Sequence, residues 1–277
     1  MDLETQLLTL VDLALQEDGA NDATSEALFE KGNTKEAVII AKQDGVVCGI
    51  QFLEKIAHRV DPDILVDPFL FDGNVVKQRM MIGALEGDIL SLLKLERVLL
   101  NFLGRLSGIA TLTSQYVKAI EGTGAVILDT RKTVPGWRYL DKFAVKTGGG
   151  INHRMGLDDV LLVKDTHVDS MGGMKKALDA LFSKNVEKPV IVEVRDMKEF
   201  QVALEFSKSL NRIMLDNFSV EMIEEAVGIA SGKILLEASG GITLENARQI
   251  AETGIHFLSI GSLTHSAKAF DMTFKVS

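Results

Sequence analysis

From residue 121 onward, short runs of aliphatic and β-branched residues alternate with amphipathic helical patterns, and this alternation restricts the fold more than any other feature of the chain. Strands are expected at residues 125–128, 143–146, 160–163, 190–194, 212–215, 234–237 and 257–260. Helices are expected at 174–183, 197–207, 220–230 and 244–252, with caps at Asp196, Ser219 and Thr243. Such short connections favour a parallel α/β sheet. We expect a barrel rather than an open sheet, because polar residues follow several strands.

The first 105 residues indicate a separate, small α+β domain. Apolar residues recur at helical spacing over residues 3–15. Pairs of extended runs then flank Asp44-Gly45 and Asp72-Gly73, dipeptides suited to tight hairpin turns. Asp88 can cap a long helical pattern that runs to Val117, and we expect this helix to join the two domains.

Composition excludes several classes of protein. With 46% hydrophobic and 25% charged residues among 277, the chain can build a large core, which excludes disorder and collagen-like repeats. Its formal net charge of −9 argues against a general affinity for nucleic acid or anionic membranes. The one cysteine, Cys48, excludes an intrachain disulfide and fits a reducing compartment. No secretory pattern opens the sequence and no apolar run approaches the ~18 residues of a membrane span, so we expect a soluble, cytoplasmic protein.

Charged and polar residues stand where the expected strands end. Asp129-Thr130-Arg131-Lys132 follows the strand at 125–128, Lys164-Asp165 follows that at 160–163, Asp216 follows that at 212–215, and Glu193 lies within the strand at 190–194. In α/β barrels the active site is built at the carboxyl ends of the strands. The pattern therefore predicts an active site on this edge, although any single position could be a solvated strand end.

Five basic groups are expected on loops that face one pocket. They are Arg131, Lys132, His153, Arg154 and Lys164. In a chain with a net charge of −9, such a cluster predicts a ligand with several negative groups, because guanidinium groups bind carboxylates and phosphates bidentately. For His153 alone, a hydrogen-bonded histidine of the core is an equally good interpretation.

Glycines follow the last two expected strands and predict a phosphate site. Ser239-Gly240-Gly241 precedes the expected helix cap at Thr243, and Gly261-Ser262 follows the strand at 257–260. Glycine lets the backbone approach an anion, and the free N–H groups of a helix start point toward it. The alternative is that these glycines only serve turns with positive φ.

Two isolated acids suit a divalent cation. Glu193 and Asp216 are expected on the same edge as the phosphate site, and hydrated Mg²⁺ commonly takes one or two protein carboxylates together with phosphate oxygens. The alternative is that both acids form salt bridges with the basic cluster.

Four segments carry a resemblance to a known family. They are DTRKTVPGWR (129–138), GGGINHRMGL (148–157), MLDN (214–217) and EASGGI (237–242). From Asn101 to Ala267 the chain resembles quinolinate phosphoribosyltransferase, with departures at Thr147 and Thr166, where the family usually has Cys and Asn. The resemblance implies an N-terminal α+β sandwich domain at 1–105, completed by 268–277, and an incomplete TIM-like barrel of fewer than eight strands at 106–267.

The resemblance also implies the reaction and its residues. Quinolinate and phosphoribosyl pyrophosphate would give nicotinate mononucleotide, pyrophosphate and CO₂ with Mg²⁺, for NAD biosynthesis, in a homodimer with shared sites. The quinolinate carboxylates would be held by Arg131, His153, Arg154 and Lys164, and Thr130 would also bind substrate. Lys132 would lie at the pyrophosphate, and Glu193 and Asp216 at the metal and ribose. The 5′-phosphate would be held by Ser239, Gly240, Gly241, Gly261 and Ser262, and Arg105 would come from the partner. Of these, Lys132, Lys164, Glu193 and Asp216 would act in catalysis.

Other functions stay open at the level of sequence. One is a molybdenum-transport-associated relative with the same fold and many of the same motifs, which the set of basic and acidic residues above disfavours. Another is a phosphate-ligand binding protein without catalysis. A third is a different phosphate-handling barrel lyase, although five basic groups exceed what one phosphate needs.

Overall fold

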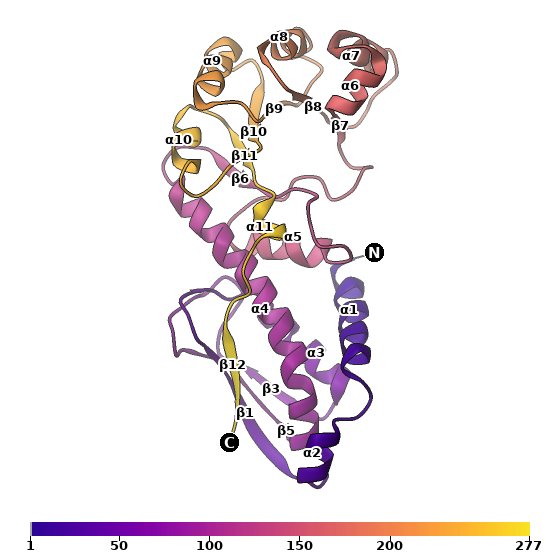
Figure 1. The fold of residues 1–277 in the computed structure, drawn as a ribbon, viewed down its shortest axis with the longest axis vertical. Helices are drawn as coiled ribbons and strands as arrows, with labels where there is room; N and C mark the ends of the chain where they lie inside the picture. Colours follow the sequence, from indigo (N-terminus) through magenta and orange to yellow (C-terminus); the bar gives the residue numbers. More distant parts are fainter. Residues whose placement is uncertain (1) are drawn as a thin grey trace. The chain divides into compact units, whose positions relative to one another are not determined.

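A computed structural model describes residues 2–277 and divides the chain into two compact units (Figure 1). The first unit comprises the chain up to Ser114 together with Thr133–Gly149 and Ser262–Ser277, and the second comprises Gln115–Lys132 and Gly150–Gly261. Besides residues 2–105 and 268–277, the first unit includes residues 106–114, 133–149 and 262–267. Among the described residues, no helix combines the length and apolarity needed to cross a bilayer.

The first unit contains an antiparallel four-stranded sheet in the order β12-β1-β5-β3. Its strands are β1 (Thr34–Ala41), β3 (Leu65–Pro68), β5 (Met81–Asp88) and β12 (Met272–Val276), and a separate ribbon pairs β2 (Gly45–Val46) with β4 (Val75–Val76). Its helices are α1 (Leu3–Asp18), α2 (Ala23–Leu28), η1 (Ile50–Phe52), α3 (Leu53–Val60), α4 (Ile89–Ala119, which continues into the second unit), α5 (Arg138–Thr147) and α11 (Ser262–His265). The pairing of β12 with β1 brings the C-terminal residues into this sheet, as the family resemblance implies.

The two tight hairpins expected in this unit are wrong. β1 pairs with β12 and β5, whereas β2 pairs with β4. Instead of shaping a hairpin, the carboxylate of Asp72 accepts the backbone N–H groups of Gly49 and Ile50 at 2.6 and 2.7 Å and so fixes the start of η1. Asp44 likewise accepts the N–H of Gln78 at 2.9 Å. Both carboxylates therefore bond to backbone far away in the sequence and do not shape a local turn.

The long helix α4 is confirmed, including its cap. Asp88 Oδ1 accepts the N–H of Leu90 at 2.9 Å. The helix stays continuous through Gly104 and Gly108. A Cβ at Gly108 would collide with the carbonyl oxygen of Lys268. Phe270 also donates its N–H to the Gly104 carbonyl at 2.8 Å. The two glycines therefore let the C-terminal segment lie directly on the helix.

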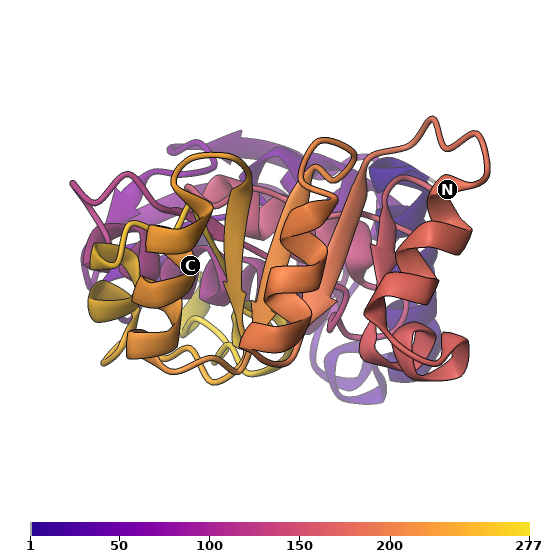
Figure 2. The ribbon, with the colours of Figure 1, turned by 90° about the horizontal axis from the view of Figure 1, so that it is seen from above.

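The second unit is a six-stranded parallel sheet covered by helices. The strands are β6 (Val126–Leu128), β7 (Leu161–Val163), β8 (Val190–Val194), β9 (Arg212–Asp216), β10 (Leu235–Ser239) and β11 (Phe257–Ser259), and the helices are α6 (Asp165–Met171), α7 (Met174–Phe182), α8 (Met197–Glu205), α9 (Val220–Ala230) and α10 (Ala247–Glu252). Their order, β6-β11-β10-β9-β8-β7, is that of a barrel left open between β6 and β7. Figure 2 shows helices lying along the sheet in front of its strands. The expected incomplete barrel is confirmed, with no closed barrel among the described residues.

In the second half of the chain, one expected strand and one expected helix cap are wrong, and two expected caps are confirmed. Residues 143–146 form part of helix α5, not a strand, because Leu140 and Ala144 bury one helical face. A short parallel bridge of Ile151 with Leu128 covers the edge of β6 instead. The caps at Asp196 and Ser219 are confirmed. The cap at Thr243 is wrong: its N–H is taken by Asn246 Oδ1 at 2.8 Å, so α10 begins only at Ala247.

Candidate active site

The register of the parallel strands gathers charged side chains on one face of the sheet. Glu193 and Glu237 are both register partners of Met214, and Ser239 pairs with Asp216 and Ser259. Because register partners point to the same face and side chains alternate along a strand, all these side chains share one face with Arg212. The alternate positions, which include Val192, Ile213, Leu236 and Leu258, are fully buried and apolar.

Lys164 and Glu193 form an ion pair at the ends of β7 and β8. Lys164 Nζ lies 3.6 Å from Glu193 Oε2. Burial raises the pKa of Glu193; Lys164 partly offsets this, while the charges of Asp216 and Asp165 raise the pKa further. Glu193 thus forms the salt bridge that the alternative interpretation expected. One lysine does not neutralise the charges of Glu193, Asp216 and Asp165 together. This carboxylate cluster favours a cation or a cationic transition state.

The two carboxylates are not a complete metal centre. Among residues 2–277, no group of three or more His, Cys, Asp or Glu side chains is arranged to hold a metal. Mg²⁺ keeps several water ligands and is usually completed by substrate oxygens, so Glu193 and Asp216 are compatible with a hydrated ion.

Arg131 and Arg154 are electrostatic neighbours. Arg154 is 9% exposed and donates from Nη1 to the carbonyl oxygen of Val160 at 3.0 Å. Burial lowers the pKa of the Arg154 guanidinium, and the charge of Arg131 lowers it further, against the opposing effect of Asp159. Because the charge of Arg154 is disfavoured by burial and by Arg131, a carboxylate or phosphate would be stabilised beside it.

The loop that carries Arg131 and the loop that carries Arg154 are joined by Asp129. This carboxylate is fully buried; Oδ2 accepts Asn152 Nδ2 at 2.6 Å and Oδ1 accepts the N–H of His153 at 2.8 Å. In the first of these loops, Thr130 Oγ1 accepts the N–H of Lys132 at 3.0 Å. Asp129 therefore positions the neighbouring basic residues.

His153 belongs to a buried network. Its Nδ1 accepts the N–H of Arg154 at 2.7 Å, which assigns the ring proton to Nε2, 3.5 Å from Glu237 Oε1. Glu237 is fully buried, accepts Arg212 Nη1 at 2.6 Å and also accepts the hydroxyl of Ser259. Burial acts to raise the pKa of Glu237, but His153, Arg212 and Ser259 together lower it below its usual value.

Sequence reasoning assigned no role to Glu237 and Arg212. The available signal was a charged residue inside an otherwise apolar strand, which is costly unless that residue is paired. The core-histidine interpretation of His153 agrees with its burial and hydrogen bonding, whereas its contact with substrate stays a prediction.

The glycine turn after β10 has the backbone geometry that requires glycine. Gly240 and Gly241 have φ of 89° and 61°, and a Cβ on Gly240 would collide with the side chain of Asn217. Asn217 donates its N–H to the carbonyl of Ser239 at 2.8 Å, and Asn246 Nδ2 donates to the carbonyl of Gly241 at 3.0 Å. Gly240 and Gly241 therefore do serve a turn with positive φ, as the alternative interpretation expected. The phosphate site stays a prediction.

Arg105 and Ser262 belong to the first unit, whereas the other expected site residues belong to the second. Arg105 Nε and Nη2 donate to the two oxygens of Asp141 at 2.9 and 2.7 Å, and the guanidinium lies 5.3 Å from the centre of the Trp137 ring. Asp141 is fully buried. Arg105 is thus held firmly by its own unit, and its role toward a substrate stays a prediction.

Comparisons with known proteins match both parts of the chain to one family. The family model "Quinolinate phosphoribosyl transferase, C-terminal domain" matches residues 109–275, and the corresponding N-terminal domain model matches residues 22–107. A Nicotiana glauca protein named quinolinate phosphoribosyltransferase [decarboxylating] 2, mitochondrial, is 41% identical over 98% of this chain and 82% of its own length. The nicotinate-nucleotide pyrophosphorylase [carboxylating] of Mycobacterium leprae is 38% identical over 91% of this chain and 89% of its own length.

Solved structures agree as well. The nicotinate-nucleotide pyrophosphorylase of Francisella tularensis superposes with a TM-score of 0.93 at 38% identity, covering 99% of this chain and 96% of that one. Both halves of the chain are therefore matched in sequence, and the whole fold is matched in structure. The chain belongs to the quinolinate phosphoribosyltransferase family.

Proposed function

We propose that this protein transfers the phosphoribosyl group of phosphoribosyl pyrophosphate to quinolinate, releasing pyrophosphate and CO₂ and forming nicotinate mononucleotide. Family membership supports this reaction, as do the names of the relatives. The observation that carries it is that anionic Glu193 and Asp216 stand at the same edge of the sheet as the cation Lys164. This edge can serve a dicarboxylate and a developing ribosyl cation together.

The charges match the demands of the reaction. Departure of pyrophosphate leaves positive charge on the ribosyl carbon, and the carboxylates of Glu193 and Asp216 stabilise it. Arg131, Arg154 and Lys164 hold the two carboxylates of quinolinate and so place its ring nitrogen against that carbon. Such positioning turns the encounter of two substrates into a reaction within one complex, which can lower the activation barrier by several kcal/mol. The alkylated ring nitrogen is then cationic and stabilises the carbanion left on the neighbouring ring carbon when CO₂ departs. That carbon takes up a proton from water to give nicotinate mononucleotide.

Mg²⁺ is part of the proposal. The raised pKa of Glu193 and the nearby charge of Asp216 fit a carboxylate pair that gains from a divalent cation. When bound, the ion would neutralise the charge of the departing pyrophosphate, with Lys132 on the same side. Ser239 and the two glycines after it, with Gly261 and Ser262, would hold the 5′-phosphate.

We further propose a homodimer in which Arg105 of each subunit reaches the site of the other. Its bidentate bond to Asp141 would preorganise the guanidinium, which makes binding to a partner's ligand less costly in entropy. A cytoplasmic location is proposed on the basis of the single buried thiol of Cys48, although the Nicotiana glauca relative is named mitochondrial.

The proposed reaction is tested by incubating purified protein with quinolinate, phosphoribosyl pyrophosphate and Mg²⁺. Mass spectrometry should detect nicotinate mononucleotide, with CO₂ released in equal amount from carboxyl-labelled quinolinate. Nicotinate in place of quinolinate serves as a control that cannot release CO₂ in this way. Tight binding of quinolinate without product would favour a ligand-binding protein, and the absence of both would refute the proposal.

A further inference from the structure

We propose that Arg195 is a positioning residue that holds the short helix α6, and through it Lys164, at the carboxyl edge of the parallel sheet. Arg195 follows Glu193 by two residues, and Lys164 directly precedes α6. The inference rests on the function proposed above, in which Lys164 binds a carboxylate of quinolinate. It gives a role to an arginine that the site described so far does not use.

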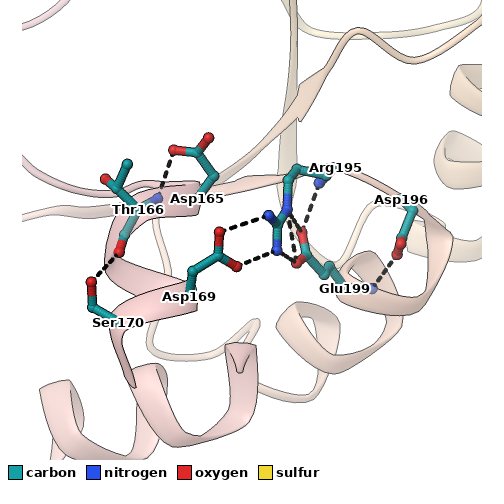
Figure 3. Close-up of polar contacts among 7 residues, drawn as sticks. All are labelled: Asp165, Thr166, Asp169, Ser170, Arg195, Asp196 and Glu199. Atoms are coloured by element: carbon teal, nitrogen blue, oxygen red, sulfur yellow. Dashed lines mark hydrogen bonds and ion pairs between the residues drawn. The ribbon is translucent and has the colours of Figure 1, made fainter. Parts of the chain in front are cut away.

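Arg195 joins two helices that follow neighbouring strands (Figure 3). Its Nη1 and Nη2 donate to the two carboxylate oxygens of Asp169 on α6 at 3.1 and 2.9 Å. Its Nε and Nη2 donate to Glu199 Oε1 on α8 at 3.1 and 2.6 Å, and its backbone N–H donates to Glu199 Oε2 at 2.8 Å. Because a guanidinium is planar and rigid, one side chain fixes both carboxylates and thereby the separation of α6 from α8.

Helix α6 packs against α7 and is otherwise mostly exposed. It contains seven residues, too few to be stable alone, and Val168 is its one buried residue. Its first turn is bonded to Lys164, whose carbonyl accepts the N–H groups of His167 and Val168 at 2.9 and 3.0 Å. The N–H of Lys164 also donates to His167 Nδ1 at 2.9 Å. A displacement of α6 would therefore displace the backbone of Lys164.

Lys164 can bind a carboxylate of quinolinate only if its ammonium is held in place. This ammonium is partly exposed and lies 3.6 Å from Glu193 Oε2. A shift of about 1 Å in a positioned group can cost on the order of 10²-fold in rate. Exposed ion pairs are individually weak, so the loss of Arg195 should loosen α6 rather than unfold it. We therefore expect the affinity for quinolinate to fall about twofold to fivefold.

Steady-state kinetics of four variants test this role. Arg195→Ala and Asp169→Asn should each raise the KM for quinolinate about twofold to fivefold, with the KM for phosphoribosyl pyrophosphate unchanged. The double variant should be no worse than either single variant, because both break the same link. Glu199→Gln keeps the bond between Arg195 and Asp169 and should have a smaller effect.

Arg248→Ala is the matched control. Arg248 also pairs with a glutamate four residues later, at 2.6 Å, and its side chain is 50% exposed against 42% for Arg195. Its second bond is to the carbonyl of Glu121, which precedes β6 rather than following a strand. We expect wild-type kinetics from this variant.

Amide hydrogen exchange measures the stability of α6 directly, without any need for catalytic turnover. Amides of residues 164–171 should exchange faster in Arg195→Ala and Asp169→Asn than in the wild type or in Arg248→Ala. Unchanged exchange there, or an equal loss of affinity for both substrates, would overturn the inference. If the wild-type protein forms no nicotinate mononucleotide, the proposed function fails and the link to catalysis fails with it, whereas the exchange data still decide whether Arg195 holds α6.

Discussion

Replacing Arg212 by alanine should destabilise the protein mainly through Glu237. The Glu237 side chain is fully buried and Arg212 Nη1 bonds to it at 2.6 Å. Removing one partner of a buried ion pair typically costs about 3–5 kcal/mol, because the other charge is left uncompensated. His153 and Ser259 still contact the carboxylate, and Arg212 is partly exposed, so the lower end, about 3 kcal/mol, is expected. Loss of the guanidinium over the Phe257 ring, 3.8 Å from its centre, acts in the same direction.

The loss should depend on pH in a defined direction. Although burial opposes it, the partners of Glu237 lower its pKa in the folded protein. The carboxylate therefore contributes stability above its unfolded pKa of about 4.3, and this contribution disappears as the pH falls through the folded pKa. Without Arg212 the folded pKa rises. The difference between wild type and variant should thus be largest near neutral pH and shrink below about pH 4.

Urea unfolding followed by far-ultraviolet circular dichroism measures this difference. Tryptophan fluorescence is unsuitable, because Trp137 lies in the first unit and Glu237 in the second. Arg248→Ala, which removes an exposed pair, should cost no more than about 0.5 kcal/mol. A cost for Arg212→Ala that is equally small, or that stays constant between neutral and acidic pH, would refute the electrostatic explanation.

Three predictions concern the proposed reaction. Arg131→Ala should reduce kcat/KM for quinolinate by about 10²–10³-fold, the usual effect of deleting one preorganised electrostatic contact, and near-normal kinetics would remove Arg131 from the site. Glu193→Gln should raise the Mg²⁺ concentration needed for half-maximal rate, and an unchanged Mg²⁺ titration would contradict the metal assignment. Mixing the inactive Arg105→Ala and Arg131→Ala proteins should restore part of the activity through hybrid dimers, and no recovery after subunit exchange would argue against shared sites.

The parts of the fold that sequence predicted well are those with a single strong local pattern. The strands at 190–194 and 212–216 each contain three consecutive apolar residues and lie between short connections, and both formed close to the expected bounds. The strand predicted at 143–146 was wrong because three apolar residues in a row occur equally well in a buried strand and in a helix. The hairpin predicted at Asp72-Gly73 was wrong because the Asp72 carboxylate bonds to backbone 22 and 23 residues away. A local turn pattern carries no information about such distant bonds.

The network around Glu237 shows what would have extended the prediction. Glu237 lies 25 residues from Arg212 and 22 from Ser259, so no local motif joins them. Their contact follows from register: Glu237 lies beside Met214, and Arg212 lies two residues before Met214 on the same face. Glu193 lies beside Met214 from the other side. Because register partners in a parallel sheet share a face, aligning the single charged position of β8 with that of β10 would have placed Glu193 and Glu237 at the same level of the sheet. A buried charge at such a level requires a counter-charge nearby, and Arg212 was the available candidate in the adjacent strand.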